Sequence, residues 1–303
     1  MTVNQRVGIV CVNFNGARYL GDFLTSLEKV ASDDWHLVLV DNGSWDGSES
    51  MAELLGDRVT LIENGANLGL AAGANIGARW CVERGYDYVL FINPDTVLQP
   101  DFLHYLLQAV EPDTLVAPKT LLFGTARLDD NVGTFDWLRG VWQDWIFDKP
   151  QSRMLDARQT VDMASLTCLL VPTSVFTKVG YINEEYFMYY EDFDFVNRAQ
   201  RAGYEVVLEP RAVIEHRKSA ASGHDTPFFT YYTTRNRMYL VRNHLKSSAK
   251  FLLFLAYFLP GRILKTVALL ARLDIGRVGA MWNGVADYFR GEMGPTRYLP
   301  RPR

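Results

Sequence analysis

The amino-acid sequence predicts an α/β fold, in which a mixed, mostly parallel sheet is flanked by helices and followed by a helical C-terminal region. In the first hundred residues, apolar and β-branched runs alternate with segments of helical periodicity. A cluster of Asn, Asp, Gly or Ser follows each of these runs, as is typical at the ends of parallel strands. Beyond residue 240, long apolar stretches carry basic but few acidic residues, which favours amphipathic helices.

The composition permits a large core and indicates an anionic partner. The chain has 303 residues, of which 48% are hydrophobic, enough for one large domain or two small ones. Its net charge of -4 is unevenly distributed, because residues 221–303 hold 13 Lys and Arg against 4 Asp and Glu. Such a basic, aromatic-rich tail is typical of a segment that meets something anionic. No nucleic-acid recognition motif accompanies it, so we expect no nucleic-acid partner.

The cysteines and the N-terminus predict a reducing, cytoplasmic location. Cys11, Cys81 and Cys168 lie far apart in apolar runs, with neither disulfide nor zinc spacing. The first residues lead directly into an apolar run and lack the layout of a signal peptide. We therefore expect the protein on the cytoplasmic side of the membrane.

Four strands and the helices between them are predicted in the N-terminal part. Continuous apolar runs indicate buried parallel strands at Val7–Val12, Leu37–Val40, Val59–Glu63 and Tyr88–Ile92. Helical spacing is expected after Gly16, around Ser48–Leu55, and from a glycine-rich loop at 64–75 to Arg84. This alternation is the order of a doubly wound sheet.

The remaining elements are less regular. A helix is expected at Pro100–Val110, and a short strand at Leu115–Ala117. Residues 124–158 are rich in Trp, Gly and Asp and have no clear period. Later we expect a strand at Met163–Val171, a helix at Val175–Val179, and strand segments at Glu205–Leu208 and Ala212–Glu215 around Pro210.

The four polar clusters at 13–16, 41–48, 64–75 and 93–96 each follow a predicted strand. Any one of them alone is typical of a turn. Ligands of open α/β sheets bind outside the carboxyl ends of the strands, so four clusters at one edge predict a binding crevice. The glycine-rich cluster lacks both the P-loop lysine and GxGxxG spacing, which argues against an ATPase or a dinucleotide site.

The segment Glu185–His216 combines carboxylates with aromatic rings and ends, after an apolar strand, at a histidine. Within ten positions, four acidic residues lie among aromatic ones that include Phe187, Tyr189, Tyr190 and Phe193; the acidic residues are Glu185, Glu191, Asp192 and Asp194. Such surroundings desolvate a carboxylate and raise its proton affinity, as a general base requires. The alternative is an acidic first turn of a helix, which the helix dipole favours.

Together, these features resemble the family-2 glycosyltransferases with the GT-A fold, especially the bacterial rhamnosyltransferase-like branch. The matching motifs are VNFNG (12–16), VDNGSWDGS (40–48), ENGANLGLAAGANIG (63–77), FINPDT (91–96), FMYYEDFDFVNRAQRAGY (187–204) and YYTTRN (231–236). Their order and spacing agree as well as their composition, over about residues 5–240. The resemblance implies a GT-A-type (Rossmann-like) domain at 1–240 and a basic amphipathic helical region at 241–303. Within the domain, 1–97 would be the nucleotide-sugar half and 98–240 the acceptor and catalytic half.

For the donor, the resemblance implies a dTDP- or UDP-sugar bound at the ends of the first four strands. Asp41 would accept the N3–H of the uracil or thymine ring. Other residues expected at the nucleotide sugar are Asn13, Asn15, Asn42, Ser44, Asn67, Gly69, Gly73 and Asn75. Arg217, Lys218 and Arg235 are candidates for contacts with the diphosphate.

The resemblance also implies a divalent metal. Asp95 corresponds to the metal-binding carboxylate of the DxD motif, and His216 would bind the same ion. Mg²⁺ or Mn²⁺ on such ligands neutralises the charge that develops on a diphosphate leaving group. Asn93 stands where the first Asp of the motif is usual, which removes one carboxylate. We expect Asn93 at the ribose or the sugar instead.

For the acceptor, the resemblance assigns the base to Asp192, which follows Glu191. Glu191 and Asp194 would orient the acceptor or the helix, Asp194 through Arg198 four residues on. The reaction is then a direct displacement with inversion at the anomeric carbon. Residues 124–158 would be a variable excursion near the acceptor, unless they are a surface loop packed by its own aromatic rings.

The first expectation for the reaction is transfer of L-rhamnose from dTDP-rhamnose to a lipid-linked or cell-surface polysaccharide precursor. Another family-2 transferase, using a UDP-hexose or UDP-N-acetylhexosamine, is the alternative. A nucleotidyltransferase is a remoter alternative, because VNFNGARYL is not the basic glycine-rich loop of that class. A non-catalytic sugar-nucleotide-binding protein is also remoter, because Asp95 and Asp192 are both present.

Residues 250–273 predict contact with a membrane surface. The uninterrupted apolar run, Phe251–Leu259, covers nine residues, against the roughly 20 that a spanning helix needs. Pro260, Arg262 and Lys265 interrupt the sequence beyond it, which predicts two amphipathic helices in the membrane interface. A homodimer contact of similar apolarity is the alternative. We expect a cytoplasmic protein, attached peripherally to the inner face of the plasma membrane.

Overall fold

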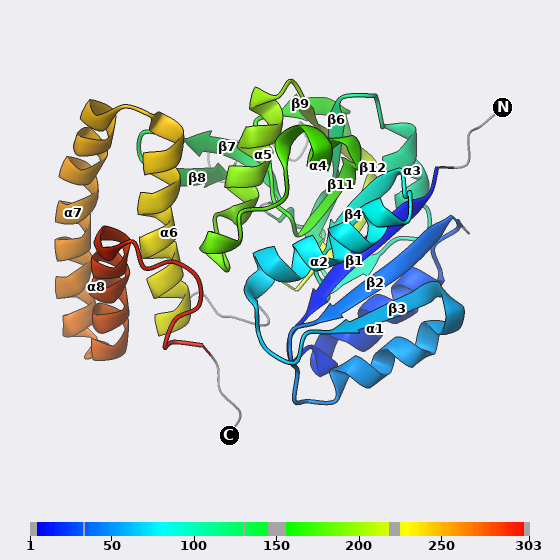
Figure 1. Cartoon of the computed structure of the whole chain (residues 1–303), viewed down its shortest axis with the longest axis horizontal. Coiled ribbons are helices and arrows are strands. Elements are labelled where there is room, and N and C mark those ends of the chain that lie inside the picture. The colour runs from blue at the N-terminus through cyan, green and yellow to red at the C-terminus, as the bar shows by residue number, and fades with distance from the viewer. Residues whose placement is uncertain (1–4, 33, 130, 145–155, 218–224, 300–303) are drawn as a thin grey trace.

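A computed structural model describes residues 5–32, 34–129, 131–144, 156–217 and 225–299 (Figure 1). Within these residues a nine-stranded sheet forms the centre of the body, and a three-stranded sheet accompanies it. Three C-terminal helices stand side by side at one end of the body (Figure 1). This arrangement confirms the predicted fold class, a mixed and mostly parallel sheet with flanking helices and a helical C-terminal region.

The N-terminal half of the chain builds the parallel edge of the main sheet. Its strands are β1 (Val7–Asn13), β2 (Trp35–Asp41), β3 (Val59–Glu63) and β4 (Tyr88–Ile92), in the order β3-β2-β1-β4. They are connected by α1 (Ala17–Glu28), the 3-10 helix η1 (Ser48–Arg58) and α2 (Gly69–Glu83). All three strand pairs are parallel, so the carboxyl ends of these strands lie at one edge, as predicted.

The second half adds mixed pairing. In the main sheet, β11 (Cys168–Pro172) is antiparallel to β4 and to β6 (Thr114–Leu122). The last strand, β12 (Glu205–His216), is parallel to β6. It is antiparallel to β5 (Thr96–Leu98) and to β9 (Gln159–Val161). The small sheet has the order β10-β7-β8, with β10 (Met163–Ala164), β7 (Val132–Asp136) and β8 (Val141–Asp144). The helices here are α3 (Phe102–Gln108), α4 (Ser174–Val179), η3 (Glu184–Tyr186) and α5 (Glu191–Arg201). Since β12 is parallel to β6 and β4, its last residue lies at the same edge as the end of β4.

Two expectations about strands are corrected. The apolar run at 163–171 is not one strand, because the chain leaves the small sheet at Ser165, whose N–H donates to the Asn131 carbonyl, before β11 joins the main sheet. The two segments around Pro210 are one strand, β12. A register shift across 209–213 leaves the proline outside the ladder, so its missing N–H costs no pairing.

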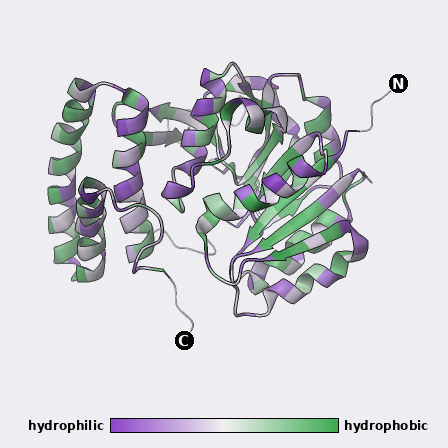
Figure 2. Ribbon diagram, in the orientation of Figure 1, coloured by the Kyte–Doolittle hydropathy of each residue, from purple (hydrophilic) through white to green (hydrophobic). Residues whose placement is uncertain are grey.

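Two apolar layers hold the helices to the sheet. On one face α1 and α3 contribute Phe23, Phe102 and Leu106, and on the other α5 contributes Phe195, which packs edge-on against Phe91 of β4. Burying one such phenyl ring stabilises the fold by roughly 1.5–3 kcal/mol. Figure 2 shows the central strands coloured as hydrophobic, which agrees with burial on both faces.

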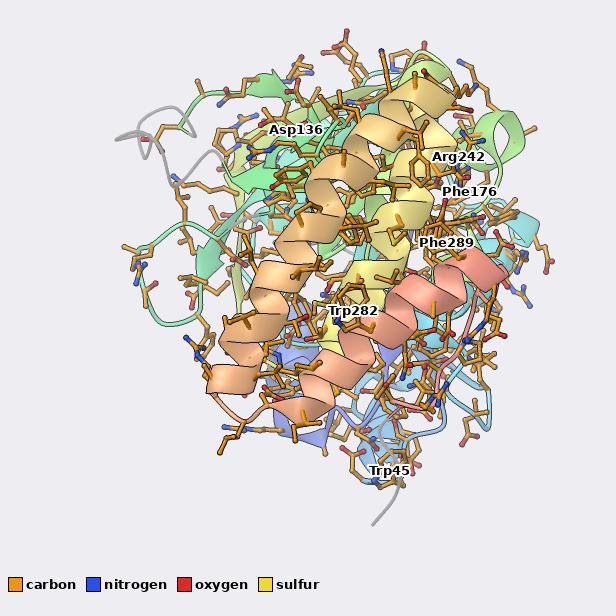
Figure 3. The ribbon with its side chains drawn as sticks, turned by 90° about the vertical axis from the view of Figure 1, so that its left-hand side faces the viewer. Trp45, Asp136, Phe176, Arg242, Trp282 and Phe289 are labelled. Atoms are coloured by element: carbon orange, nitrogen blue, oxygen red, sulfur yellow. The ribbon has the colours of Figure 1, made fainter. Side chains whose placement is uncertain are left out.

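The C-terminal helices are α6 (Pro227–Leu245), α7 (Ser248–Ala271) and α8 (Ile275–Arg290), so this unit begins upstream of the predicted boundary at residue 241. A Cβ on Gly284 of α8 would lie 2.8 Å from a carbonyl of α6, which explains the close approach of these two helices. The predicted pair of helices at 250–273 is one helix, because α7 continues through Pro260. Viewed from the side of this unit, α7 and α8 lie in front of α6 and form the outer surface (Figure 3).

Candidate active site

Asp41 is the centre of a buried hydrogen-bond network at the carboxyl ends of β1 and β2. Its Oδ1 accepts from Asn13 Nδ2 at 2.8 Å and from the Ser44 hydroxyl at 2.5 Å, and its Oδ2 accepts from the Ser44 N–H at 2.8 Å. Asn15 closes the same turn by accepting from the Trp45 N–H. The structure thus brings four predicted donor-site residues together. Since Asn13 and Asp41 are 0% and 3% exposed, they form the floor of this end of the sheet, and contact of Asp41 with a base stays a prediction.

Other residues predicted at the nucleotide sugar join helix α2 to its neighbours. Asn42 Nδ2 donates to the Gly69 carbonyl at 3.0 Å, and Asn67 Oδ1 accepts from the Gly69 N–H at 2.9 Å. Gly73 lies so close to β1 that a Cβ would be 2.8 Å from a Val12 methyl group. These polar and glycine residues therefore shape the start of α2 beside β1.

Asn75 points away from that edge. It is 1% exposed, its Nδ2 donates to the Ile182 carbonyl at 2.8 Å, and its Oδ1 accepts from the Ile182 N–H at 3.0 Å. The predicted lining role does not match this position. Its amide satisfies both backbone groups of Ile182 and so ties α2 to the chain that leads into the acidic segment.

Gly69 brings the acidic segment to the start of α2. Its φ is +87°, and a Cβ at this position would lie 2.5 Å from the Phe187 carbonyl oxygen. Only glycine tolerates both the backbone conformation and the close approach. The loop that leads into Glu191 and Asp192 therefore lies beside the helix start that follows β3, at the edge where the predicted donor cluster is found.

Asp95, His216 and Asp129 form a buried line of polar side chains. His216 Nε2 is 3.3 Å from Asp95 Oδ1, and His216 Nδ1 is 2.6 Å from Asp129 Oδ2. The pairing of β5 with β12 produces this approach, because it sets His216 opposite Thr96, the residue after Asp95. Burial lowers the pKa of His216, but the hydrogen bonds to Asp129 and Asp95 outweigh it and raise the pKa to about 9. Without a metal ion the imidazole is therefore protonated at neutral pH and bridges two carboxylates, and a metal ion bound at Nε2 would replace the proton there.

The same side chains fit a divalent cation that has few protein ligands. The 3.3 Å between Asp95 Oδ1 and His216 Nε2 is close to the roughly 3 Å that separates neighbouring ligands of an octahedral Mg²⁺ at about 2.1 Å. In the part of the chain that the structure describes, no group of three or more His, Cys, Asp or Glu could hold a metal. One or two protein ligands, completed by substrate phosphates and water, are usual for Mg²⁺. Asp129 would hold the imidazole in place through Nδ1.

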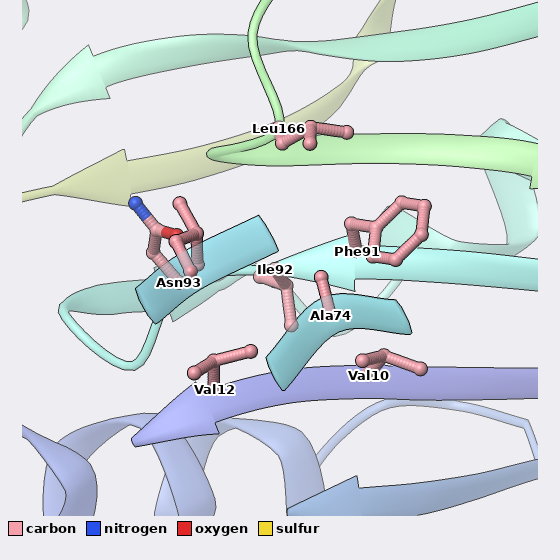
Figure 4. Close-up of a pocket in the computed structure, with 8 residues that line it drawn as sticks. Val10, Val12, Ala74, Phe91, Ile92, Asn93 and Leu166 are labelled. Carbon is pink, nitrogen blue, oxygen red and sulfur yellow. The ribbon is translucent and has the colours of Figure 1, made fainter. Parts of the chain in front are cut away.

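Asn93 stands at one end of a small apolar pocket between β1, β4 and α2 (Figure 4). The pocket is also lined by Val10, Val12, Leu70, Ala74, Phe91, Ile92 and Leu166. The backbone of Asn93 is fixed, because its N–H donates to the Thr167 carbonyl and its carbonyl accepts from the Thr96 hydroxyl. The half-buried side chain forms the polar end of the pocket, and its contact with ribose or sugar stays a prediction.

Arg217 lies next to the Asp95–His216 pair. Its N–H donates to the Asp95 carbonyl at 3.0 Å, while its guanidinium pairs with Asp22 and lies over the Phe123 ring at 3.6 Å. The residue is half-buried, so a diphosphate contact requires exchange of the Asp22 partner. Lys218, the neighbouring candidate, lies outside the described residues.

The loop before Asp192 has strained backbone. Phe187, Tyr189 and Tyr190 adopt φ angles of 65°, 67° and 74°. A left-handed conformation costs a bulky residue on the order of 1–3 kcal/mol, and it persists only where the surroundings hold it. Strain of this kind is frequent at functional sites.

Helix α6 holds this loop through Arg235 and Asn236. Asn236 Nδ2 lies 2.8–2.9 Å from three loop carbonyls, those of Tyr186, Met188 and Tyr189. Arg235 is 0% exposed, and its guanidinium donates to the carbonyls of Glu185, Tyr186 and Gly294. The expected contact of Arg235 with a diphosphate does not match this interior position. The YYTTRN motif instead supports the loop that presents the acidic pair.

Glu191 and Asp192 begin helix α5 in surroundings of low polarity. The Phe193 ring stacks on Trp142 with centroids 5.2 Å apart and lies 4.8 Å from Phe135. Burial raises the pKa of Asp192 to about 6, although its Oδ1 accepts the Phe193 N–H. Burial and the Asp192 charge raise the pKa of Glu191 well above its ordinary value, and Glu191 Oε2 has no hydrogen-bond partner among the described residues. Asp192 is therefore ionised above about pH 6, and a desolvated, ionised carboxylate suits a general base.

Asp194 has a different environment. It accepts from Arg198 Nε at 2.8 Å and is hydrogen-bonded to His244 Nε2 at 2.8 Å. Burial alone would raise its pKa, but these two partners outweigh burial and lower it. The His244 ring also packs against Trp137 at 5.1 Å. As expected, Asp194 acts through Arg198 on the position of the helix, and it also connects α5 to α6.

Sequence reasoning missed Asp129, Asn236 as a loop support, and His244. Asp129 lies in the aperiodic segment 124–158, where an acidic residue is indistinguishable from a surface residue. Asn236 was inside a recognised motif, but its role depends on carbonyls that belong to a distant loop. His244 is the last histidine of a long helix, and nothing in its neighbours indicates a buried partner.

Known proteins resemble this chain in both sequence and fold. The model of glycosyl transferase family 2 matches residues 8–176. An N-acetylglucosaminyl-diphospho-decaprenol L-rhamnosyltransferase from Mycobacterium tuberculosis is 30% identical over 248 residues, covering 72% of this chain and 78% of the relative. A dTDP-rhamnosyl transferase from Shigella flexneri is 24% identical over 257 residues, covering 80% of this chain and 82% of the relative.

Solved structures share the fold at low identity. GalNAc-T7 with UDP, GalNAc and Mn²⁺ has a TM-score of 0.57 and 15% identity, and the match covers 70% of this chain but 44% of that one. The mannosyltransferase from Pyrobaculum calidifontis, in complex with GDP-Man and Mn²⁺, has a TM-score of 0.57 and 13% identity, with coverage of 96% and 89%. At these identities the likenesses show the fold alone.

Proposed function

The chain belongs to glycosyl transferase family 2, and we propose that it is an inverting transferase that moves a hexose from a dTDP- or UDP-sugar to a hydroxyl group. The observation that carries this proposal is the pairing of two sites at one edge of the sheet. The Asp95–His216 pair lies at the ends of β4 and β12, and the loop before Asp192 contacts the start of α2, which follows β3.

On the acceptor side, Asp192 takes the proton of the attacking hydroxyl. Its pKa of about 6 leaves it ionised at neutral pH, yet basic enough to accept a proton as the new bond forms. Glu191, buried beside it, orients the acceptor. The strained loop, with Arg235 and Asn236 behind it, fixes the position of this pair.

On the donor side, Asp95 and His216 hold the metal, and Asp129 orients His216. A Mg²⁺ or Mn²⁺ there supplies a positive charge for the diphosphate that leaves. Mn²⁺ in two solved structures of this fold supports a divalent ion. A base on the acceptor side and a cation on the leaving-group side correspond to a single displacement, which inverts the anomeric centre.

The names of the relatives support L-rhamnose as the sugar and dTDP as its carrier. They also support an acceptor in which a sugar is linked through a diphosphate to a lipid. A hydroxyl group of that sugar would receive the transferred sugar. A UDP-hexose or UDP-N-acetylhexosamine is the second candidate for the donor.

The outer face of α7 supports attachment to a membrane. Its large exposed side chains are Leu252 at 63%, Leu253 at 57%, Ile263 at 55%, Leu264 at 72% and Val267 at 63%. By length and composition alone, α7 is one helix that could cross a membrane. Its other face packs against α6 and α8 through Phe254 and Phe258, which favours a helix lying in the interface of the inner leaflet.

Calorimetric titration with dTDP and with UDP, each with and without Mn²⁺, tests this function. We expect one of the two nucleotides to bind more tightly when Mn²⁺ is present, followed by transfer from the matching sugar nucleotide in a panel of donors. Failure of both nucleotides to bind would refute the proposal. Binding that is unaffected by Mn²⁺ would remove the metal from it.

A further inference from the structure

A cluster of cations lies between α6, α7 and the turn that joins β7 to β8. It consists of Arg237 of α6, Arg262 and Lys265 of α7, and Arg139 of the turn, and we call it the basic cluster. Arg237 donates to the Arg139 carbonyl from Nε at 3.0 Å and from a terminal nitrogen at 2.6 Å. The guanidinium carbons of Arg262 and Arg237 lie 4.7 Å and 5.1 Å from the centroid of the Phe258 ring.

The two cations of α7 stand on the inward face of the helix. The buried side chains of α7 are Phe251, Phe254, Phe258 and Leu269, and the steps of three and four residues between Phe258, Arg262, Lys265 and Leu269 continue that stripe. Arg262 and Lys265 are half-buried, whereas the exposed leucines lie on the opposite face. Charged side chains rarely take inward positions unless they have a partner.

No carboxylate partner for Arg237, Arg262 or Lys265 belongs to the described residues. Within them, no carboxylate lies within ion-pair distance of Arg237, Arg262 or Lys265, and the buried Arg262 Nε has no hydrogen-bond partner. Burial lowers the pKa of Arg262, and the charge of Arg237 lowers it further. Burial also lowers the pKa of Lys265, with Arg262 adding to the effect and Asp225 opposing it. An anion between these side chains would relieve their repulsion and use their free donors.

The basic cluster is next to the acceptor side of the candidate site. Tyr190 follows the strained loop and precedes Asp192 by two residues, and its hydroxyl is 3.5 Å from the Gly140 carbonyl in the β7–β8 turn. Burial raises the pKa of Tyr190, and the charges of Arg237, Arg262 and Asp192 also act on it, so Tyr190 is near both the cluster and the proposed base. The charges that act on His216 come from Asp95 and Asp129 instead. The cluster is therefore near Tyr190, on the side of the proposed base, and its charges are not among those that act on His216.

On its other side, the basic cluster adjoins the exposed apolar face of α7. Ile263, Leu264 and Val267 alternate along the helix with Arg262 and Lys265, and more than half of each of these apolar side chains is exposed. Contacts thus lead from Tyr190, two residues before Asp192, through the turn that holds Arg139 to Arg237 and Arg262, beside the exposed apolar side chains of α7. A ligand with a hydroxyl-bearing sugar, a phosphate and a hydrocarbon chain has the same order of groups.

We propose that Arg237, Arg262 and Lys265 bind the phosphate of a lipid-linked acceptor, so that its sugar reaches Asp192 while its hydrocarbon chain stays in the membrane beside α7. This inference rests on the proposed transferase function and specifies its acceptor class. Guanidinium groups suit this task because they donate hydrogen bonds to phosphate oxygens in a fixed geometry.

Vesicle binding by the full chain tests the proposal without a donor sugar. Phosphatidylcholine vesicles that carry a polyprenyl phosphate are compared with vesicles that carry phosphatidylglycerol at the same total charge. We expect affinity for the polyprenyl phosphate vesicles to be higher by about tenfold or more, as charge-assisted hydrogen bonds to a phosphate provide. Arg262→Gln should abolish this preference, Lys265→Gln should reduce it, and Arg262→Lys should retain part of it.

Arg272→Gln is the matched control, since it removes the same charge at the exposed end of α7. It should weaken binding to both kinds of vesicle equally and leave the preference intact. A wild-type protein without the preference, or an equal loss of preference in Arg262→Gln and Arg272→Gln, would overturn the inference. Nucleotide titrations on the same preparations show whether each variant is folded. They also separate failure of this inference from failure of the transferase function, because donor binding should be unchanged in every variant.

Discussion

Replacing Asp192 by Asn should inactivate the protein and stabilise it at the same time. Burial raises the pKa of Asp192 from the ordinary value of 3.8 to about 6. Since the folded-state pKa is the higher one, the cost of the buried charge is absent below about pH 4 and complete above about pH 6. The difference corresponds to on the order of 3 kcal/mol of lost stability at pH 8. An uncharged asparagine of the same shape avoids that cost, while loss of the base should lower kcat by roughly 10²–10⁴-fold.

Asp194→Asn is the matched control, because this carboxylate lies in the same helical turn and its pKa is shifted the other way. Its hydrogen bonds to His244 and Arg198 outweigh burial and lower the pKa. Its contribution to stability is therefore present above about pH 4 and lost as the pH falls through the folded-state pKa. Losing the charge should destabilise the protein at pH 8 by about 1–3 kcal/mol.

Urea unfolding of the wild type and both variants, at pH 8 and near pH 4.5, measures these changes. We expect Asp192→Asn to be more stable than the wild type by about 3 kcal/mol at pH 8 and by only about 1 kcal/mol at the lower pH, with Asp194→Asn less stable at pH 8. An Asp192→Asn variant that is no more stable than the wild type at pH 8 would refute the claim that this carboxylate is held ionised in a desolvated site.

Three further predictions concern the supports of the site and the membrane face. Asp129→Ala should weaken Mn²⁺ binding in the presence of nucleotide by roughly 10–100-fold, since it frees His216 Nδ1, and titration of Mn²⁺ by electron paramagnetic resonance measures this; unchanged Mn²⁺ affinity would remove Asp129 from the metal site. Asn236→Ala should lower kcat much more than donor affinity and cost about 1–3 kcal/mol in unfolding experiments, because three loop carbonyls lose their donor; a change in KM for the donor alone would contradict its role as a loop support. The double variant Leu264→Gln and Val267→Gln should release the protein from vesicles without changing its melting temperature, since both side chains are more than half exposed. Conversion of a dimer to a monomer in sedimentation experiments would instead assign this face to the homodimer.

Much of the fold was predictable because parallel strands impose simple rules. Buried β-branched runs identify β1 to β4, and parallel pairing then sets the polar clusters after them at one edge. The resemblance, not the strand pattern, implied that Asp95 and His216 meet, and the structure explains their proximity because β4 and β12 end at that edge. Those features depend on the local pattern and on one topological regularity.

The remaining features depend on contacts between distant segments. Arg235 lies in a conspicuous motif, but only the folded chain shows that three carbonyls use its guanidinium in the interior. Pro260 has the usual sequence signature of a helix end, yet packing of α7 against α6 and α8 keeps the helix continuous through it. Asp129 belongs to a segment without periodicity, so its position next to His216 could not be deduced from neighbouring residues.

Nucleotide binding by the Asp192→Asn variant tests the central claim most directly, namely that Asp192 serves the acceptor while Asp95 and His216 serve the donor. In calorimetric titrations with the preferred nucleotide and Mn²⁺, we predict near wild-type affinity for Asp192→Asn together with loss of sugar transfer. His216→Ala should show the reverse dependence, with weakened binding only when Mn²⁺ is present. Weak nucleotide binding by Asp192→Asn would contradict the account, because Asp192 would then belong to the donor side.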